Sequence, residues 1–241
     1  MKAILYIGHG TRSKQGAEEA RSFVHRVMER IDIPIQELSF LELTEPSIAQ
    51  GFTKCIEKGA SEITVVPIFL LAAGHIKKDI PDTLDELKKQ YPEVIVKVKD
   101  PFGVQELLLD GLAELIISSA GDISPSDSIL IVGRGSSDPS IHKAFTEIGE
   151  GIKMRLGASF VSVCYLAAAH PSFDEGLELI TEQAGGRVIV VPYLLFSGLL
   201  LSEVNQKVRK RQSGDKSIIH TGQLSKHKVI EDLIIKRAIE L

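Results

Sequence analysis

Short apolar runs alternate along the chain with longer stretches in which apolar and charged residues mix. Eight runs have the length and near-continuous apolarity of strands buried on both faces of a parallel sheet: residues 3–7, 35–40, 62–68, 94–98, 129–133, 159–166, 187–195 and 217–222. The stretches between them carry apolar side chains three and four positions apart, as amphipathic helices do. In the first half of the chain these stretches are residues 13–31, 45–59, 77–90 and 104–119. The pattern predicts an α/β fold with parallel sheets.

The second half of the chain repeats the first at an interval of 125 residues. Three pairs of landmarks keep this interval: Gly8 and Gly133, Pro46 and Pro171, and Pro67 and Pro192. The turn-rich segment 121–128 lies between the two halves. We therefore expect two similar parallel-sheet βα domains, 1–122 and 123–241, that arose by internal duplication and enclose a cleft between them.

Polar residues that follow the first three strands differ between the two halves. At the interval of 125, three replacements stand out: His9 by Arg134, Glu42 by Ala167, and His75 by Leu200. Open α/β sheets bind their ligands at the carboxyl ends of the strands. Two imidazoles and one carboxylate suit a first-row divalent ion and leave coordination positions open for a reaction. We therefore predict a metal site formed by His9, Glu42 and His75 in the first domain.

Hydroxyl and guanidinium groups follow the glycine turn of each half. The candidates are Thr11, Arg12 and Ser13 in the first half, and Arg134, Ser136 and Ser137 in the second. A strand-to-helix turn exposes backbone N–H groups and can bind anions. These residues are candidates for binding a ligand with several carboxylates or phosphates, whereas helix capping is the alternative role of the hydroxyl groups. The glycines are expected to allow a tight turn.

The remaining histidines and the two cysteines give weaker signals. Four histidines lie in a charged helix, near helix starts or in a strand, and are expected to be structural or solvated: His25, His142, His220 and His227. His170, which precedes a proline at a helix start, is a minor candidate for the cleft. Cys55 and Cys164 form no CxxC or other sulfur cluster and are expected to be buried structural thiols.

Composition narrows the functional class without identifying it. The chain has 241 residues, of which 44% are hydrophobic and 25% charged, and a formal net charge of −4 that gives no sign of nucleic-acid binding. No apolar run approaches the roughly 20 residues that span a bilayer, and the amino terminus has no signal-peptide pattern. We expect a cytoplasmic protein that binds neither nucleic acid nor membrane. Two fused domains suffice to close a cleft, so a monomer is expected.

Five segments resemble the two-lobed sirohydrochlorin chelatases of the class II group: ILYIGHGTR, FLELTEPSI, VVPIFLLAAGHIKKDIP, IVGRGSSDP and VVPYLLFSGLL. The resemblance covers nearly the whole chain. It implies a lyase that inserts Fe²⁺ into sirohydrochlorin, an octacarboxylate tetrapyrrole, to form sirohaem, with no cofactor beyond the divalent metal substrate. It also implies that His9 and His75 bind the metal and act in catalysis with Glu42 nearby. The related long-form cobaltochelatase has a histidine-rich tail and an iron–sulfur centre that this sequence lacks, which favours the ferrochelatase branch.

Alternatives to the ferrochelatase hypothesis differ in metal, chemistry or class. A cobaltochelatase for cobalamin synthesis needs the same residues, because Co²⁺ and Ni²⁺ also suit such a site. A non-catalytic carrier of metal or tetrapyrrole needs the binding groups without proton transfer. Phosphohistidine phosphatases place an Arg–His–Gly turn after their first strand, but Gly8 stands where that arginine would be. A dinucleotide-binding protein is disfavoured because both glycine turns lack the third glycine of that fingerprint.

Overall fold

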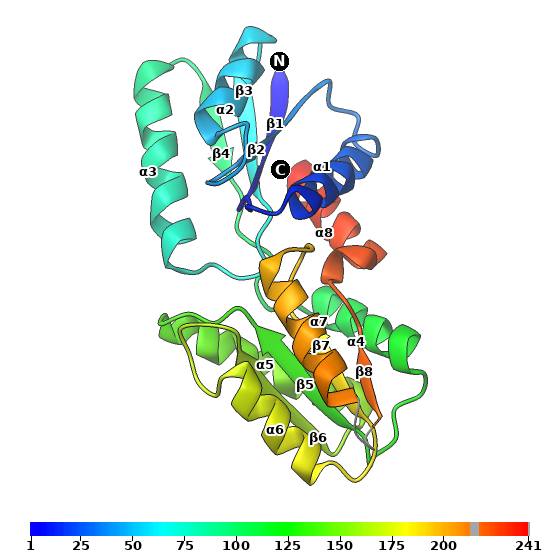
Figure 1. Cartoon of the computed structure of the whole chain (residues 1–241). Helices are drawn as coiled ribbons and strands as arrows, with labels where there is room; N and C mark the ends of the chain where they lie inside the picture. The colour runs from blue at the N-terminus through cyan, green and yellow to red at the C-terminus, as the bar shows by residue number, and fades with distance from the viewer. Residues whose placement is uncertain (213–216, 241) are drawn as a thin grey trace. The chain divides into compact units, whose positions relative to one another are not determined.

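The chain folds into two α/β units, each built on a four-stranded parallel sheet (Figure 1). The computed structural model describes residues 1–212 and 217–240, except the side chain of His75. Unit 1 comprises Met1–Gly103 and Ile230–Leu241, and unit 2 comprises Val104–Val229. Strands and helices alternate along both units, which confirms the predicted α/β fold and parallel sheets.

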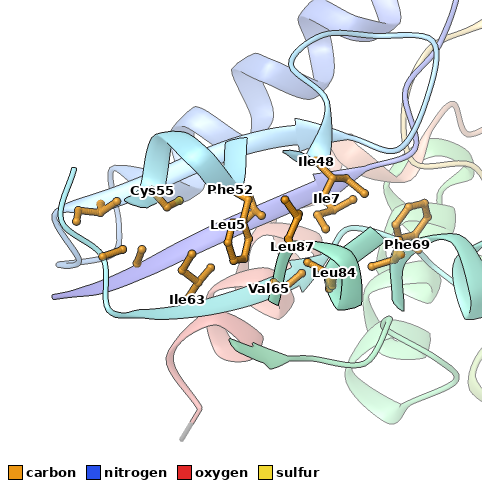
Figure 2. Close-up of a cluster of buried hydrophobic side chains, with 14 residues drawn as sticks. Leu5, Ile7, Ile48, Phe52, Cys55, Ile63, Val65, Phe69, Leu84 and Leu87 are labelled. Carbon is orange, nitrogen blue, oxygen red and sulfur yellow. The ribbon is translucent and has the colours of Figure 1, made fainter. Parts of the chain in front are cut away.

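The sheet of unit 1 has the strand order β2-β1-β3-β4. Its strands are β1 (Lys2–Gly8), β2 (Ile35–Phe40), β3 (Glu62–Pro67) and β4 (Ile95–Val98). Its helices are α1 (Lys14–Met28), α2 (Ile48–Glu57), α3 (Gly74–Gln90) and α8 (Lys228–Ile239). Figure 2 shows how Leu5 and Val65 of the sheet meet Phe52 of α2 and Leu84 of α3 in one buried apolar cluster. Burial of these side chains is the main force that holds the helices on the sheet.

The sheet of unit 2 repeats this arrangement with the order β6-β5-β7-β8. Its strands are β5 (Ser128–Gly133), β6 (Phe160–Tyr165), β7 (Val188–Pro192) and β8 (Ile218–His220). Its helices are α4 (Glu106–Ala120), α5 (Pro139–Leu156), α6 (Phe173–Gln183) and α7 (Leu199–Gln212), with a short 3₁₀ helix at Leu224–Lys226. Cys164 in β6 and Cys55 in α2 are both buried and free, which confirms that neither forms a disulfide among the described residues.

Local features of the backbone repeat at the predicted interval of 125 residues. Four kinds of pair do so: the bridges Phe40–Ser47 and Tyr165–Ser172, the cis prolines Pro46 and Pro171, the left-handed residues Leu43 (φ 61°) and Ala168 (φ 54°), and the capping boxes that begin at Ser47 and Ser172. The internal duplication inferred from sequence therefore extends to individual turns.

The glycines of the two turns have different roles, although a tight turn was predicted from all of them. Gly10 and Gly135 have φ values of 93° and 90°, which favour glycine. A Cβ on Gly10 would lie 1.7 Å from the carbonyl oxygen of Glu42. Gly8 and Gly133 instead leave room for a ring, because a Cβ there would lie 3.2 Å from Phe40 and 2.4 Å from Phe145, respectively. Only the second glycine of each pair makes the turn.

Helices begin a few residues away from the starts that the apolar pattern predicts. The stretch predicted as a helix over 45–59 becomes helical only at Ile48, because Ser47 accepts a hydrogen bond from the backbone N–H of Gln50 and caps the helix. The helix predicted over 77–90 begins earlier, at Gly74.

Across the described ranges, no helix is both long enough and apolar enough to cross a membrane.

The last helix of each half belongs to the compact unit of the other half. Helix α4 precedes β5 in the chain and lies in unit 2, whereas nearly all of α8, from Ile230 onward, lies in unit 1. Arg30, which follows α1, pairs with Glu231 of α8 at 3.2 Å, and Arg155 of α5 pairs with Glu106 of α4. Both arginines and both glutamates keep the interval of 125 residues. The compact units thus differ from the sequence halves 1–122 and 123–241 by the exchange of these two helices.

A buried carboxylate closes the amino-terminal end of the sheet in unit 2. Asp127 is 2% exposed and accepts hydrogen bonds from the backbone N–H of Ser124 at 2.8 Å and from Nη2 of Arg187 at 2.6 Å. The guanidinium of Arg187 also donates to the carbonyl of Ala120 at the end of α4. The Arg187 side chain lowers the pKa of Asp127 to about 2.

We expect Asp127→Asn to lower the free energy of unfolding by about 2–3 kcal/mol, because the substitution leaves Arg187 without its carboxylate. The unfolded carboxyl group binds a proton near pH 4 and the folded one near pH 2, so its stabilising contribution is present above pH 4 and is lost between these values. Urea unfolding from pH 6 to pH 2.5 would measure both effects. Asp85→Asn, at an exposed ion pair with Lys88, is the control and should change little. Equal behaviour of the two variants would contradict the prediction.

Candidate functional site

Three of the predicted site residues follow three neighbouring strands of the sheet in unit 1. Strand β1 lies between β2 and β3, so the chain leaves β1 toward one neighbour and later returns to its other side. Such a reversal of strand order opens a crevice at the carboxyl ends of the strands, which is where open α/β sheets bind ligands. His9 directly follows β1, and Glu42 lies two residues beyond β2.

The structure brings His9 and Glu42 together. Nδ1 of His9 lies 3.5 Å from Oε1 of Glu42, and the two side chains are 29% and 54% exposed. The backbones are also joined, since the N–H of Glu42 donates to the carbonyl of His9 at 3.0 Å. Gly10 permits this close approach, because any side chain there would overlap the carbonyl of Glu42. The backbone of the two turns therefore holds the imidazole and the carboxylate close together, as predicted.

The spacing of this pair fits two chemical roles. Two ligands held about 2.1 Å from one ion in a tetrahedral arrangement have donor atoms about 3.4 Å apart, close to the observed distance. Alternatively, a carboxylate beside one ring nitrogen orients the imidazole so that the other nitrogen can bind a metal. In both cases the partial exposure of the two side chains leaves them accessible to a ligand from solvent.

His75, the third predicted ligand, is described only by its backbone. It lies in the first turn of α3, which follows β3, the strand next to β1. Its side chain lies outside the described residues. Among the side chains that the structure does describe, no group of three or more histidine, cysteine, aspartate or glutamate residues is placed to hold a metal ion. The three-residue metal site stays a prediction, and the structure shows only that His9 and Glu42 lie close together.

Two residues near this pair were not predicted. Oγ1 of Thr44 accepts a hydrogen bond from the N–H of Thr11 at 2.9 Å and donates to the carbonyl of Thr11 at 3.0 Å. It thereby holds the loop after β2 against the turn after β1. The ring of Phe69 lies 6.1 Å from that of His9. Thr44 could have been found from sequence, because the second half has Ala169 at the matching position.

Hydroxyl groups in both turns accept backbone hydrogen bonds just before or at the start of the helices that follow. Ser13 accepts from the N–H of Gly16 at 3.1 Å, and Thr11 accepts from the N–H of Ser13 at 3.1 Å. In unit 2, Ser136 accepts from the N–H of Asp138 at 3.1 Å. Of these candidates only Ser13 therefore has the capping role, as the N-cap of α1, whereas the N-cap of α5 is Asp138. The other three candidates are exposed: Arg12, Arg134 and Ser137.

Contacts within the protein explain most of the remaining histidines. Nε2 of His142 lies 3.1 Å from the carbonyl of Ser136, and Nε2 of His227 lies 3.2 Å from Glu114. His220, at the end of β8, accepts a hydrogen bond from the N–H of Gly222, and burial lowers its pKa. His170, the minor candidate, has an 86% exposed side chain whose Nδ1 lies 3.4 Å from the capping-box residue Glu175. These contacts agree with structural or solvated roles.

The sequence profile of the CbiX family matches residues 3–119 and 128–241. The chain belongs to the CbiX family. The CbiX profile thus covers both halves of the repeat, and the gap between its two matches lies where the sequence pattern places the boundary. Family membership also confirms the resemblance to sirohydrochlorin chelatases that the five segments indicate.

Individual CbiX relatives agree over nearly the full length. "Sirohydrochlorin ferrochelatase" of Priestia megaterium is 42% identical over 94% of this chain and 85% of its own length. "Sirohydrochlorin cobaltochelatase" of the same organism is 30% identical over 100% of this chain and 80% of its own. The solved structure "SirB from Bacillus subtilis with Fe3+" has a TM-score of 0.88 at 33% identity and covers 98% of this chain and 93% of its own. The two-sheet fold is therefore that of a chelatase.

Proposed function

We propose that this CbiX-family protein is a sirohydrochlorin ferrochelatase, an enzyme that inserts Fe²⁺ into sirohydrochlorin to form sirohaem without a nucleotide. The name of the Priestia megaterium relative, 42% identical over 94% of this chain, gives the reaction. The observation that carries the proposal is the His9–Glu42 pair, with 3.5 Å between its donor atoms, beyond the carboxyl ends of β1 and β2. Unit 2 has Arg134 and Ala167 at these positions, so the pair is a feature of one unit only.

Metal insertion sets opposing demands on the site. Two protons must leave the pyrrole nitrogens, and the metal must lose most of its water. A set of ligands that binds too tightly would keep the ion. Two neutral imidazoles and one carboxylate bind Fe²⁺ without a thiolate and with coordination positions open to the macrocycle. In this proposal His9 and His75 hold the incoming ion.

The same imidazoles serve as proton acceptors. An imidazole released from the metal has a pKa near neutrality in water, which suits it to accept a pyrrole proton. Glu42 supplies negative charge to a dicationic centre and, 3.5 Å from Nδ1 of His9, orients that ring. Domain 1–122 thus supplies the metal and proton chemistry.

In the proposal, the turns that follow β1 and β5 bind the carboxylates of the substrate. Arg12 and Arg134 are exposed and can form bidentate pairs with peripheral carboxylates of the tetrapyrrole. Thr11, Ser13 and Ser136 already accept backbone hydrogen bonds, so each can still donate its hydroxyl proton to a carboxylate, as can Ser137. Domain 123–241 acts in the proposal as the part that holds the substrate.

A cobaltochelatase is the second candidate, and one relative with that name aligns over all of this chain at 30% identity. The ligand types do not separate Fe²⁺ from Co²⁺ or Ni²⁺, because all three bind imidazole and carboxylate. In either case the proposal includes sirohydrochlorin and a divalent ion as partners, no further cofactor, and a monomer that acts in the cytoplasm without nucleic acid or membrane.

The proposal is tested by incubating the purified chain with sirohydrochlorin and Fe²⁺, Co²⁺ or Ni²⁺ under anaerobic conditions and following the absorbance of the macrocycle. We expect insertion of Fe²⁺ to be faster than the spontaneous reaction in proportion to the protein concentration. Acceleration with Co²⁺ alone would support the cobaltochelatase instead. Binding of the tetrapyrrole without acceleration by any ion would indicate a carrier and would overturn the proposed function.

A further inference from the structure

Leu43, next to Glu42, has an unusual backbone and an exposed side chain. Its φ of 61° lies in the left-handed region, where glycine, asparagine and aspartate are favoured over other residues. The side chain is 53% exposed, so it does little to fill the core of unit 1. Neither the local conformation nor core packing accounts for a leucine at this position.

Hydrogen bonds fix the backbone on both sides of Leu43. The residue before it, Glu42, donates its N–H to the carbonyl of His9 at 3.0 Å. The residue after it, Thr44, bonds both backbone groups of Thr11 through its hydroxyl. Leu43 is therefore held between two contacts to the turn that carries His9. An apolar side chain is presented to solvent beside the proposed metal site.

The duplicated unit separates the role of the backbone from the role of the side chain. Ala168, the counterpart of Leu43, has nearly the same φ, 54°. The turn therefore needs the left-handed conformation in both units, and alanine is sufficient to form it. A large apolar group appears only in unit 1, where the His9–Glu42 pair lies. This is the same asymmetry that distinguishes the metal-binding candidates.

We propose that Leu43 contacts the tetrapyrrole and packs its isobutyl group against the apolar face of the macrocycle beside the His9–Glu42 pair. The inference rests on the proposed function, because it assigns the ligand from it. Leu43 contributes to substrate affinity by removing apolar surface from water and takes no part in metal binding or proton transfer.

Leu43→Ala is expected to raise the KM for sirohydrochlorin about tenfold, the effect of losing roughly half the burial of a leucine side chain. The kcat and the dependence of the rate on Fe²⁺ concentration should stay within about twofold, because the metal-binding groups are untouched. Leu43→Met, which keeps a flexible apolar side chain of similar size, should restore the KM. The dissociation constant of the metal-free tetrapyrrole complex, from fluorescence titration of the full chain, should follow the KM.

Leu179→Ala is the matched control, because this leucine is 49% exposed and lies on the surface of α6. It should leave both constants unchanged. Leu43→Gly guards against misfolding, since glycine accepts a positive φ, and it should bind as weakly as Leu43→Ala. Wild-type affinity in Leu43→Ala or Leu43→Gly would overturn the inference. If the wild type binds the tetrapyrrole but inserts no metal, the proposed function fails, and the titration still decides the contact of Leu43.

Discussion

Replacing either His9 or His75 with alanine is expected to lower the rate of catalysed metal insertion by at least about 100-fold. That is the lower limit of what a positioned general base contributes, and each variant also removes a metal ligand. His9 pairs with Glu42 at 3.5 Å, so its loss also leaves the carboxylate without its neighbour. Initial rates at saturating sirohydrochlorin and varied Fe²⁺ would measure the change, with circular dichroism as the check that the fold is intact.

His25→Ala is the control for these two variants. His25 is exposed in the last turn of α1, and its removal should leave the rate unchanged. Glu42→Gln keeps the size of the side chain and removes its charge, so it should lower the apparent affinity for Fe²⁺ more than the affinity for the tetrapyrrole. Full activity of His9→Ala would show that the pair beyond β1 and β2 is not the site of reaction.

Gly10→Ala is expected to destabilise unit 1 by about 3–4 kcal/mol and to remove activity even in the fraction that stays folded. A Cβ at this position would lie 1.7 Å from the carbonyl oxygen of Glu42, and the φ of 93° is one that alanine rarely adopts. Relief of the overlap must push the loop after β2 away from the turn after β1. The distance between His9 and Glu42 would then increase. Urea unfolding and the insertion rate measure the two consequences.

Two further glycines separate the causes of this effect. Gly103 has a φ of 67° but open space around its α-carbon, so Gly103→Ala should cost only about 1 kcal/mol, the penalty for the left-handed backbone. Gly135→Ala should destabilise unit 2 as much as Gly10→Ala destabilises unit 1, since its Cβ would lie 1.8 Å from the carbonyl of Ala167. Equal effects of all three substitutions would refute the steric explanation.

Periodicity predicts the elements of this fold and does not predict which unit each helix completes. The apolar runs locate the eight strands of the described residues, because a strand covered on both faces is apolar along its length. The edge strand β4 departs from the expected burial, since Ile95 is 59% and Val98 48% exposed. An amphipathic helix such as α4 is recognised by its apolar face, but that face fits any apolar surface of matching shape. The partner of Arg30 is equally ambiguous in the sequence, because Glu106 and Glu231 are equivalent residues of the repeat. The exchange of α4 and α8 is decided by three-dimensional packing alone.

The differences between the two halves of the repeat carry the strongest sequence signal of the site. These differences distinguish His9 and Glu42 from many other polar residues, and the structure places the two side chains 3.5 Å apart. The repeat does not separate capping from ligand binding for Ser13, because one hydroxyl can serve both roles. Polar differences between the halves do not indicate Leu43, whose unusual features are its φ of 61° and its 53% exposure in the folded chain.

The exchange of helices affects how the protein can be made. Unit 1 contains residues 1–103 and also the segment from Ile230 onward, so its sheet leaves the ribosome before unit 2 and lacks α8 until unit 2 has been translated. Glu231 and Asp232, which pair with Arg30, are translated 201 and 202 residues after it. Unit 1 therefore stays incomplete until unit 2 has been translated, and the residues against which Ile230, Leu233 and Ile234 of α8 are buried remain uncovered until then.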